Sequence, residues 1–317
     1  MPPAPFHADL AQGPEGGRAT WLQADDGLRL RMLLWPAQSK GRVLVLPGRG
    51  EYGEKYGPVA SELARRGYGT VTLDWRGQGL SDRLLTDVQA GHVGDFYDYQ
   101  RDLAAVLAAL EAAGEPAPMF MIAHSMGGCI ALRALMNGLQ MRAVAFSAPM
   151  WGIDMSIRLR SAAWGLCTAA WLGRFSHSYV PGSGPGSWVL TQPFDTNSLT
   201  SDPEAYRWMV AQLVARPELG IGGPTLGWLN AALRETALLS LRPSPPIPAF
   251  TAVGTQETIV SVAAIHRRMT QWPGGRLEEL PGARHEILME RPMVRQAFYD
   301  AATTLFDAGR PGAAPSG

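Results

Sequence analysis

The stretch that decides the fold is Pro118-Met-Phe-Met-Ile-Ala-His-Ser-Met-Gly-Gly-Cys-Ile-Ala-Leu-Arg-Ala-Leu-Met136. Residues 118–122 form a short apolar run typical of a buried strand, and residues 129–135 carry apolar side chains typical of a packed helix. Ser125 lies at the sharp junction between them, where only small neighbours let the two backbones approach closely. The pattern predicts a nucleophilic serine above the sheet edge. A plain turn serine remains the alternative, because Ala123 stands where the strict pattern has glycine.

Predicted strands and helices alternate on both sides of this junction. Strands are predicted at 19–23, 28–35, 43–46, 70–73, 118–122, 143–147, 249–253 and 276–280, and helices at about 55–66, 95–114, 129–135 and 292–306. Asp25-Asp26-Gly27 predicts a tight turn that joins the first two strands as a hairpin. Asp95 is the expected N-cap of the second helix. Such alternation predicts an α/β fold with a mostly parallel, eight-stranded sheet covered by helices on both faces.

The alternation stops before residues 151–240, which divides the chain into a core and an insertion. This segment holds six of the ten tryptophans and helix signals, but no convincing strand. We therefore expect a helical cap inserted into a core made of residues 19–150 and 241–308. Residues 1–18 are rich in proline, glycine and alanine and are predicted to be a flexible arm. Residues 309–317 are predicted to be a disordered tail.

Composition excludes several classes of protein. The 317 residues, 46% of them hydrophobic, can bury one large core, and 28 basic against 28 acidic residues leave no net field that would attract nucleic acid. The two cysteines have no disulfide or metal spacing. No signal peptide is evident, and the longest apolar stretch, 161–173, is shorter than a membrane span. We expect a cytoplasmic protein without metal or cofactor. Peripheral contact of the cap with the inner membrane face stays open, as does the oligomeric state.

A serine hydroxyl needs a base, and the base needs an orienting acid. Among six histidines, only His285 lies in a short loop directly after a predicted strand, at the carboxyl end of the sheet. A structural histidine before the last helix is the alternative. The acid is expected between Ser125 and His285 in the chain. Glu257 follows a predicted strand, whereas the alternatives Glu278 and Glu279 lie within one.

An oxyanion formed by attack on a carbonyl needs two N–H donors. The backbone N–H of Met126, directly after the serine, is one candidate. The second is the backbone N–H of Arg49, because Pro47-Gly48-Arg49-Gly50 bends sharply after the strand at 43–46.

Six motifs resemble those of one known family. They are Leu46-Pro-Gly-Arg-Gly-Glu, Leu73-Asp-Trp-Arg-Gly-Gln-Gly-Leu-Ser-Asp, Gly91-His-Val-Gly-Asp-Phe, Ala123-His-Ser-Met-Gly-Gly, Gly254-Thr-Gln-Glu and Gly282-Ala-Arg-His-Glu-Ile. Together they resemble the α/β-hydrolase branch that holds bacterial lysophospholipases and monoacylglycerol lipases. The resemblance covers residues 20–306 and implies the α/β-hydrolase fold, with Ser125 as nucleophile, Glu257 as acid and His285 as base. Pro47, Ala123 and Glu257 depart from the histidine, glycine and aspartate usual at these positions.

The resemblance and the Trp-rich insertion together suggest a substrate class. An apolar cover suits a single acyl chain, so we expect a serine hydrolase that cleaves lysophospholipid or monoacylglycerol esters through an acyl-enzyme. A peptidase or amidase, a general carboxylesterase and a non-catalytic binding protein are the alternatives. His124, Trp151 and the Arg49 guanidinium are candidate substrate contacts. Arg49 could meet a lysophospholipid phosphate, or else pair with nearby Glu51 or Glu54.

Overall fold

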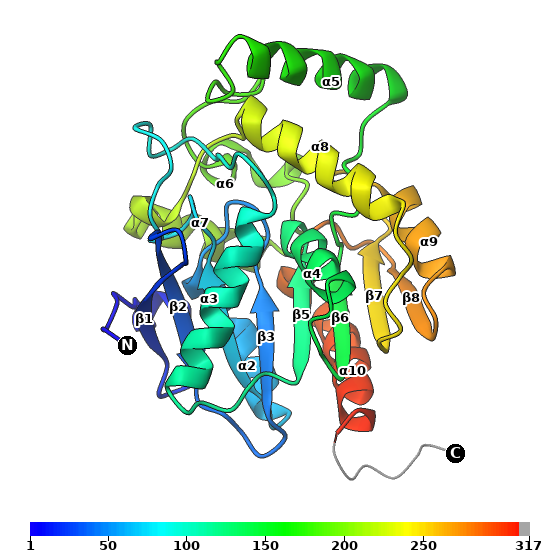
Figure 1. Cartoon of the computed structure of the whole chain (residues 1–317). Helices are drawn as coiled ribbons and strands as arrows, with labels where there is room; N and C mark the ends of the chain where they lie inside the picture. The colour runs from blue at the N-terminus through cyan, green and yellow to red at the C-terminus, as the bar shows by residue number, and fades with distance from the viewer. Residues whose placement is uncertain (311–317) are drawn as a thin grey trace.

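A single sheet of eight strands, in the order β1-β2-β4-β3-β5-β6-β7-β8, forms the centre of the protein (Figure 1). The computed structural model describes residues 1–310. The strands are β1 Arg18–Gln23, β2 Arg29–Trp35, β3 Arg42–Leu46, β4 Gly69–Asp74, β5 Phe120–His124, β6 Ala143–Ser147, β7 Ala249–Gly254 and β8 Gly275–Leu280. β2 runs antiparallel to β1 and β4, and all other pairs are parallel. The prediction of a mostly parallel sheet is confirmed.

The central strands β3 and β5 are mostly apolar because both of their faces are covered. Every residue of β3 and of β5 is buried, and Val43 lies opposite Phe120 in their parallel register. A strand packed on two sides cannot alternate apolar and polar residues, so it reads as a continuous hydrophobic run. β1 and β2 pair antiparallel at the edge of the sheet and are joined by the predicted Asp-Gly turn.

Helices cover both faces of the sheet. They are α2 Gly57–Arg65, α3 Asp98–Ala112, α4 Met126–Met136, α9 Val262–Thr270 and α10 Pro292–Ala308. In Figure 1, α3 and α4 lie in front of the sheet, and α2 and α10 lie behind it. The expected start of α3 is wrong. Asp95 does not cap the helix, because its carboxylate accepts the Tyr97 N–H (2.9 Å) in a separate turn, and the helix begins only at Asp98.

The segment 151–240 is helical. It contains α5 Ile157–Leu172, α6 Trp188–Thr191, α7 Pro203–Ala215 and α8 Leu226–Ser240, with 3₁₀ turns at Phe194–Thr196 and Pro217–Leu219. α5 packs on α8, and both lie beyond the ends of the sheet strands in Figure 1. We refer to these elements as the cap. None of the helices within residues 1–310 is long and apolar enough to cross a bilayer.

The first 18 residues are not a loose arm, contrary to expectation. Pro3 bridges to Thr20 of β1, and a short helix, α1 (Ala8–Ala11), follows. Phe6 meets the Trp35 ring edge-on with 5.9 Å between centroids, and Ala11 is fully buried beside it. These two apolar side chains anchor a segment whose composition alone suggested mobility. The predicted disordered tail, 309–317, lies outside the described residues from 311 onward.

Candidate active site

Ser125 lies at a strained turn between β5 and α4. Its φ of 48° and ψ of −118° belong to a region that non-glycine residues avoid. A side chain at Gly127 would lie 2.3 Å from the Leu46 carbonyl oxygen, and one at Gly128 would lie 2.5 Å from Pro149. The small residues are therefore needed because β3 and the loop after β6 touch the start of α4.

The structure brings together the three side chains predicted as a triad. His285 Nε2 lies 2.9 Å from Ser125 Oγ, and His285 Nδ1 lies 2.7 Å from Glu257 Oε2. The three residues follow β5, β7 and β8, whose carboxyl ends meet at one edge of the sheet. The other Glu257 oxygen accepts the backbone N–H groups of Ile259 (2.6 Å) and Val260 (3.2 Å), which fixes the carboxylate beneath the imidazole.

The charges of this pair favour its ionised form. Burial opposes the charge on His285, but the Glu257 carboxylate more than offsets it, so the pKa of His285 lies above its usual value. Burial also opposes the charge on Glu257 and by itself would raise its pKa. His285 and the two backbone donors lower the pKa by more than that, so the net shift is downward. An imidazolium formed by proton transfer to His285 is thus stabilised at this position.

The alternative acids lie elsewhere, as do two of the other histidines. Glu279 of β8 pairs with His266 (2.9 Å), and Glu278 lies 3.4 Å from Arg276. His92 Nδ1 contacts the Thr225 hydroxyl at 2.8 Å. This contact joins the start of α8 to a loop of the body, by which we mean the described residues outside 151–240.

Two backbone N–H groups beside Ser125 are free to bind an oxyanion. Among the described residues, no acceptor satisfies the Met126 or the Arg49 backbone N–H. Their neighbours are occupied, because the Gly48 N–H donates to the Glu51 carboxylate and the Gly50 N–H donates to Gln78 Oε1. These two side chains bind the amides on either side of Arg49 and leave the Arg49 amide unpaired.

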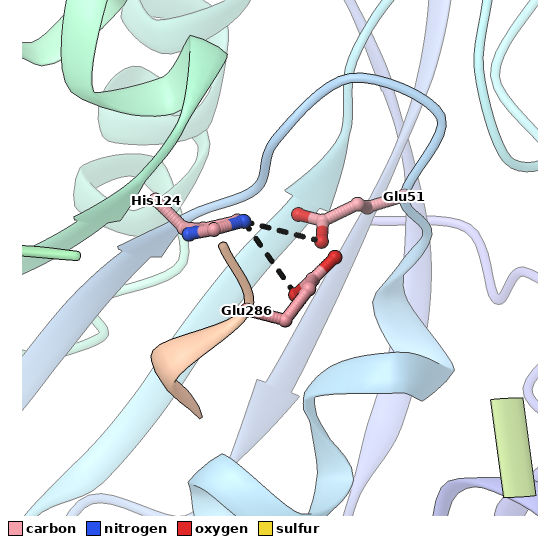
Figure 2. A group of neighbouring side chains, drawn as sticks. All are labelled: Glu51, His124 and Glu286. Carbon is pink, nitrogen blue, oxygen red and sulfur yellow. Dashed lines mark ion pairs between the residues drawn. The ribbon is translucent and has the colours of Figure 1, made fainter. Parts of the chain in front are cut away.

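Three buried ionisable side chains, Glu51, His124 and Glu286, form a cluster (Figure 2), in which the His124 ring lies 4.8 Å from the His285 ring between centroids. His124 Nε2 faces two carboxylates, 3.8 Å from Glu51 Oε1 and 3.5 Å from Glu286 Oε2. The Lys55 ammonium pairs with both, at 2.6 Å from Glu286, and the Tyr56 hydroxyl donates to Glu51. Glu51 binds the loop after β3, and Glu286 directly follows His285 in the loop after β8. Lys55 therefore connects these two loops.

One ammonium shared by two carboxylates separates their proton affinities. Burial opposes the charge on Glu51, but Lys55 reverses this, so its pKa falls well below the usual range. Burial and the neighbouring Glu51 charge outweigh Lys55 at Glu286 and raise its pKa to about 7. Burial lowers the pKa of His124 to about 3, which keeps this imidazole neutral.

The protonation of His124 follows from its second nitrogen. His124 Nδ1 lies 3.0 Å from the Ser147 carbonyl oxygen, which can only accept, so Nδ1 carries the proton. Its bare Nε2 then faces Glu51 and Glu286, which is favourable only when one of them is protonated. The raised pKa of Glu286 meets this requirement. The potential ligand atoms of these three residues lie within 4.8 Å of one another, as at metal sites, but Lys55 is already their cation.

The triad opens into a cavity of about 310 Å³ with largely apolar walls. Its walls include Met150, Ile153, Met155, Val180, Trp228 and Leu229, so both the body and the cap contribute. An outer cavity of about 340 Å³ adjoins it and shares Arg49, Glu51 and Glu286 with it. A larger hollow of about 750 Å³ beside α7 and α10 contains none of the predicted site residues.

The three predicted substrate contacts differ in outcome. His124 and Arg49 line the inner cavity. Trp151 does not line it and is wrongly assigned, because its ring stacks on Trp272 and its Nε1 donates to the Gly128 carbonyl (3.1 Å) in the core.

Sequence reasoning missed the roles of Glu51, Lys55 and Glu286. The first and last lie inside quoted motifs, and Glu286 adjoins His285, so their positions were a signal. Nothing in the local pattern indicates that a charged side chain is buried, since burial depends on which loops meet. The cap contributes too, because the Glu286 N–H donates to the Leu199 carbonyl (2.7 Å).

The geometry agrees with what known proteins share with this chain. The family described as "Serine aminopeptidase, S33" matches residues 37–292. The chain belongs to this family of serine hydrolases. It is 32% identical to lysophospholipase L2 of Escherichia coli (strain K12), over 90% of this chain and 88% of that protein. A probable lysophospholipase L2 of Haemophilus influenzae is 28% identical, over 85% of each chain.

A solved structure shows the same fold. A soluble variant of monoglyceride lipase from Saccharomyces cerevisiae, crystallised with a substrate analogue, superposes with a TM-score of 0.72 at 21% identity. The match covers 92% of this chain and 95% of that one. The prediction of an α/β-hydrolase of the lysophospholipase and monoacylglycerol lipase branch is confirmed.

Proposed function

We propose that this chain hydrolyses carboxylic esters of single-chain lipids, lysophospholipids or monoacylglycerols, through an acyl-enzyme at Ser125. The observation that carries the proposal is the continuous contact from Ser125 Oγ through His285 to Glu257, at 2.9 Å and 2.7 Å, on the floor of an apolar cavity. His285 is the general base, Glu257 orients it, and the backbone N–H groups of Arg49 and Met126 bind the oxyanion.

In the first half-reaction, Ser125 Oγ attacks the acyl carbonyl carbon while its proton passes to His285 Nε2. The carbonyl oxygen becomes an oxyanion that accepts hydrogen bonds from the Arg49 and Met126 amides. When the tetrahedral intermediate collapses, the bond to the leaving alcohol breaks, and His285 returns its proton to that oxygen. Glu257 stabilises the transient imidazolium and keeps the imidazole in the required tautomer.

In the second half-reaction, water replaces the alcohol. His285 accepts a proton from the water as its oxygen attacks the acyl carbon, and the same two amides bind the new oxyanion. Collapse breaks the bond to Ser125 Oγ, which regains a proton from His285, and a free fatty acid leaves. The cycle needs no metal or cofactor.

The cavity walls favour one acyl chain as the group next to the serine. The flexible, unbranched side chains of Met150 and Met155 can adapt to a linear chain, and the cavity of about 310 Å³ is small for two chains. The named activities of the curated relatives, lysophospholipase L2 and monoglyceride lipase, agree with this substrate class.

The family description also names an aminopeptidase, but the residues that line the cavity give less support to a peptidase activity. An aminopeptidase needs a free carboxylate to bind the substrate amine. The acidic residues that line the inner cavity are Glu51 and Glu286, and both already pair with Lys55. Asp202 of the cap binds the backbone N–H groups that begin α7.

We also propose that the cap contacts a lipid surface. α5 turns its small residues Ala163, Cys167 and Ala170 inward and exposes large apolar ones, including Ile157 (86% exposed) and Leu172 (70%). This reverses the usual pattern of a helix in water. No acidic residue occurs between Asp154 and Asp195, whereas three arginines do, so the surface suits an anionic bilayer.

Serine labelling tests the catalytic assignment. Wild-type protein should hydrolyse p-nitrophenyl acyl esters and react with a fluorophosphonate probe, and Ser125→Ala should lose both. Ser240→Ala, an exposed serine at the end of α8, should keep both. Full activity in Ser125→Ala would refute the proposal.

A substrate series tests the ester assignment. One acyl chain is offered on glycerol, on glycerophosphocholine and as a peptide amide, and we expect turnover of the first two. Faster release from the amide would favour the peptidase instead.

A further inference from the structure

Arg49 occupies a position between the two cavities at the active site. Its backbone follows β3 in the loop that offers the oxyanion amide, and its side chain lines both the inner apolar cavity and the outer one. The outer cavity has a more polar wall, with the hydroxyl residues Ser183, Ser187 and Ser198. A substrate whose ester carbonyl lies at Ser125 and whose acyl chain fills the inner cavity must direct its head group to this outer space.

The charge of Arg49 has no carboxylate partner among the described residues. Its guanidinium donates to the Gly222 carbonyl oxygen (2.7 Å) and lies over the Trp228 ring, 5.3 Å from the ring centroid. Its Nε is buried without an acceptor. The two acids close to it in sequence are taken, since Glu51 pairs with Lys55 and Glu54 with Arg31.

Such a charge is costly to bury. The guanidinium retains the proton at neutral pH although burial lowers the pKa of Arg49 to about 10. Arg31 provides the contrast, because it is fully buried but binds Glu54 at 2.6 Å and Asp74 at 2.7 Å. The other cation on the cavity walls, Lys55, is held by two carboxylates. Of the two cations that line the inner and outer cavities, Arg49 is thus the one left for an anion from outside.

We propose that the Arg49 guanidinium binds the phosphate of a lysophospholipid head group in the outer cavity, so that the enzyme prefers lysophospholipids to monoacylglycerols with the same acyl chain. This rests on the proposed function, because Ser125 must hold the ester. In a lysophospholipid only the glycerol carbons separate the acyl ester from the phosphate, and in Arg49 only the side-chain stem separates the oxyanion amide from the guanidinium. One residue can therefore contact both ends of this unit.

The first test measures binding without turnover. Short-chain ether analogues, 1-O-octylglycerophosphocholine and 1-O-octylglycerol, are titrated into Ser125→Ala by calorimetry. We expect the phosphate-bearing analogue to bind about 10- to 100-fold more tightly, the usual strength of a charged hydrogen bond. Arg49→Met in the same background should remove the difference, and Arg49→Lys should restore part of it. Equal binding of the two analogues to Ser125→Ala would overturn the proposal, even if the Arg49 variants failed to fold.

The second test measures selectivity. The ratio of kcat/KM for octanoyl-lysophosphatidylcholine over monooctanoylglycerol should fall about 10- to 100-fold in Arg49→Met. Arg83→Met is the matched control, because Arg83 also donates to cap carbonyl oxygens, of Glu218 and Gly220, but lines neither cavity. Its ratio should stay unchanged.

Two further outcomes separate the sources of the anion. Inorganic phosphate and glycerophosphocholine are added as competitors. Competition by glycerophosphocholine but not by phosphate supports a head-group site, whereas competition by phosphate alone would overturn it. An equal fall for both substrates in Arg49→Met would also overturn it while leaving the ester hydrolase intact. Activity in Ser125→Ala would instead remove the proposed function.

Discussion

The body and cap sides of the cavity are built in opposite ways. On the body side, the charged side chains other than Arg49 are held by several partners, as Glu257 is by His285 and two backbone amides, and Lys55 by two carboxylates. On the cap side, the cavity wall is apolar, and α5 exposes large apolar residues to the outside. From this difference we expect the body to hold the reacting atoms in place, and the cap to accommodate the acyl chain and contact the lipid surface. Catalysis should therefore depend steeply on single body residues and weakly on single cap residues.

The largest effect is expected at Glu257. Glu257→Gln keeps the shape but removes the charge that orients His285 and stabilises its imidazolium, so kcat should fall about 10⁴-fold. Steady-state hydrolysis of a p-nitrophenyl ester measures the loss. Glu279→Gln is the control, because Glu279 lies in β8 against His266 and should keep wild-type turnover. An equal loss in both variants would place the orienting acid elsewhere.

The next effect concerns the stability of the body side. Lys55→Met leaves Glu51 and Glu286 buried without their cation and should lower the free energy of unfolding by about 3–5 kcal/mol, as measured in urea. Lys55→Met with Glu286→Gln should recover part of the loss, because one uncompensated carboxylate is removed. Lys40→Met breaks the half-exposed pair with Asp307 and a contact with the Tyr68 ring, and should cost about 1 kcal/mol. Similar costs for Lys40 and Lys55 would contradict the coupling of the two loops.

A smaller effect is expected on the cap. Trp171→Ser combined with Leu172→Ser removes two exposed apolar side chains and should weaken binding to vesicles of anionic phospholipid by about tenfold. Turnover of a monomeric p-nitrophenyl ester should not change. Met293→Ser alters an even more exposed apolar residue on α10 and should leave vesicle binding as it is. Salt should weaken wild-type binding, because Arg158, Arg160 and Arg174 contribute charge.

The same contrast explains what the sequence could predict. The strands, the elbow and the order Ser125, Glu257, His285 depend on local patterns, such as apolar runs and small residues at a tight junction, and these patterns led to the triad. The partners of Arg49 and the packing of Trp151 depend on which distant loops meet. A pair between Arg49 and Glu51 or Glu54 was one alternative, but Glu51 binds Lys55 instead, and Lys55 also reaches Glu286. Residues 1–18 packed for the same reason, since Trp35 offered a surface that composition does not reveal.

The smallest effect is a shift in pH dependence at Glu286. Only neutral His285 can accept the Ser125 proton, so kcat/KM should fall as pH drops through the raised pKa of His285, with a midpoint above 6.5. Burial acts against this elevation, Glu257 is its main source, and Glu286 contributes further. Because its own pKa is raised to about 7, Glu286 is only partly ionised near this midpoint, so Glu286→Gln should move the midpoint to lower pH by only roughly 0.3 pH units. Glu279→Gln, remote from His285, should leave the midpoint in place. A shift to higher pH in Glu286→Gln would mean that the buried cluster destabilises the imidazolium, contrary to the charges assigned here.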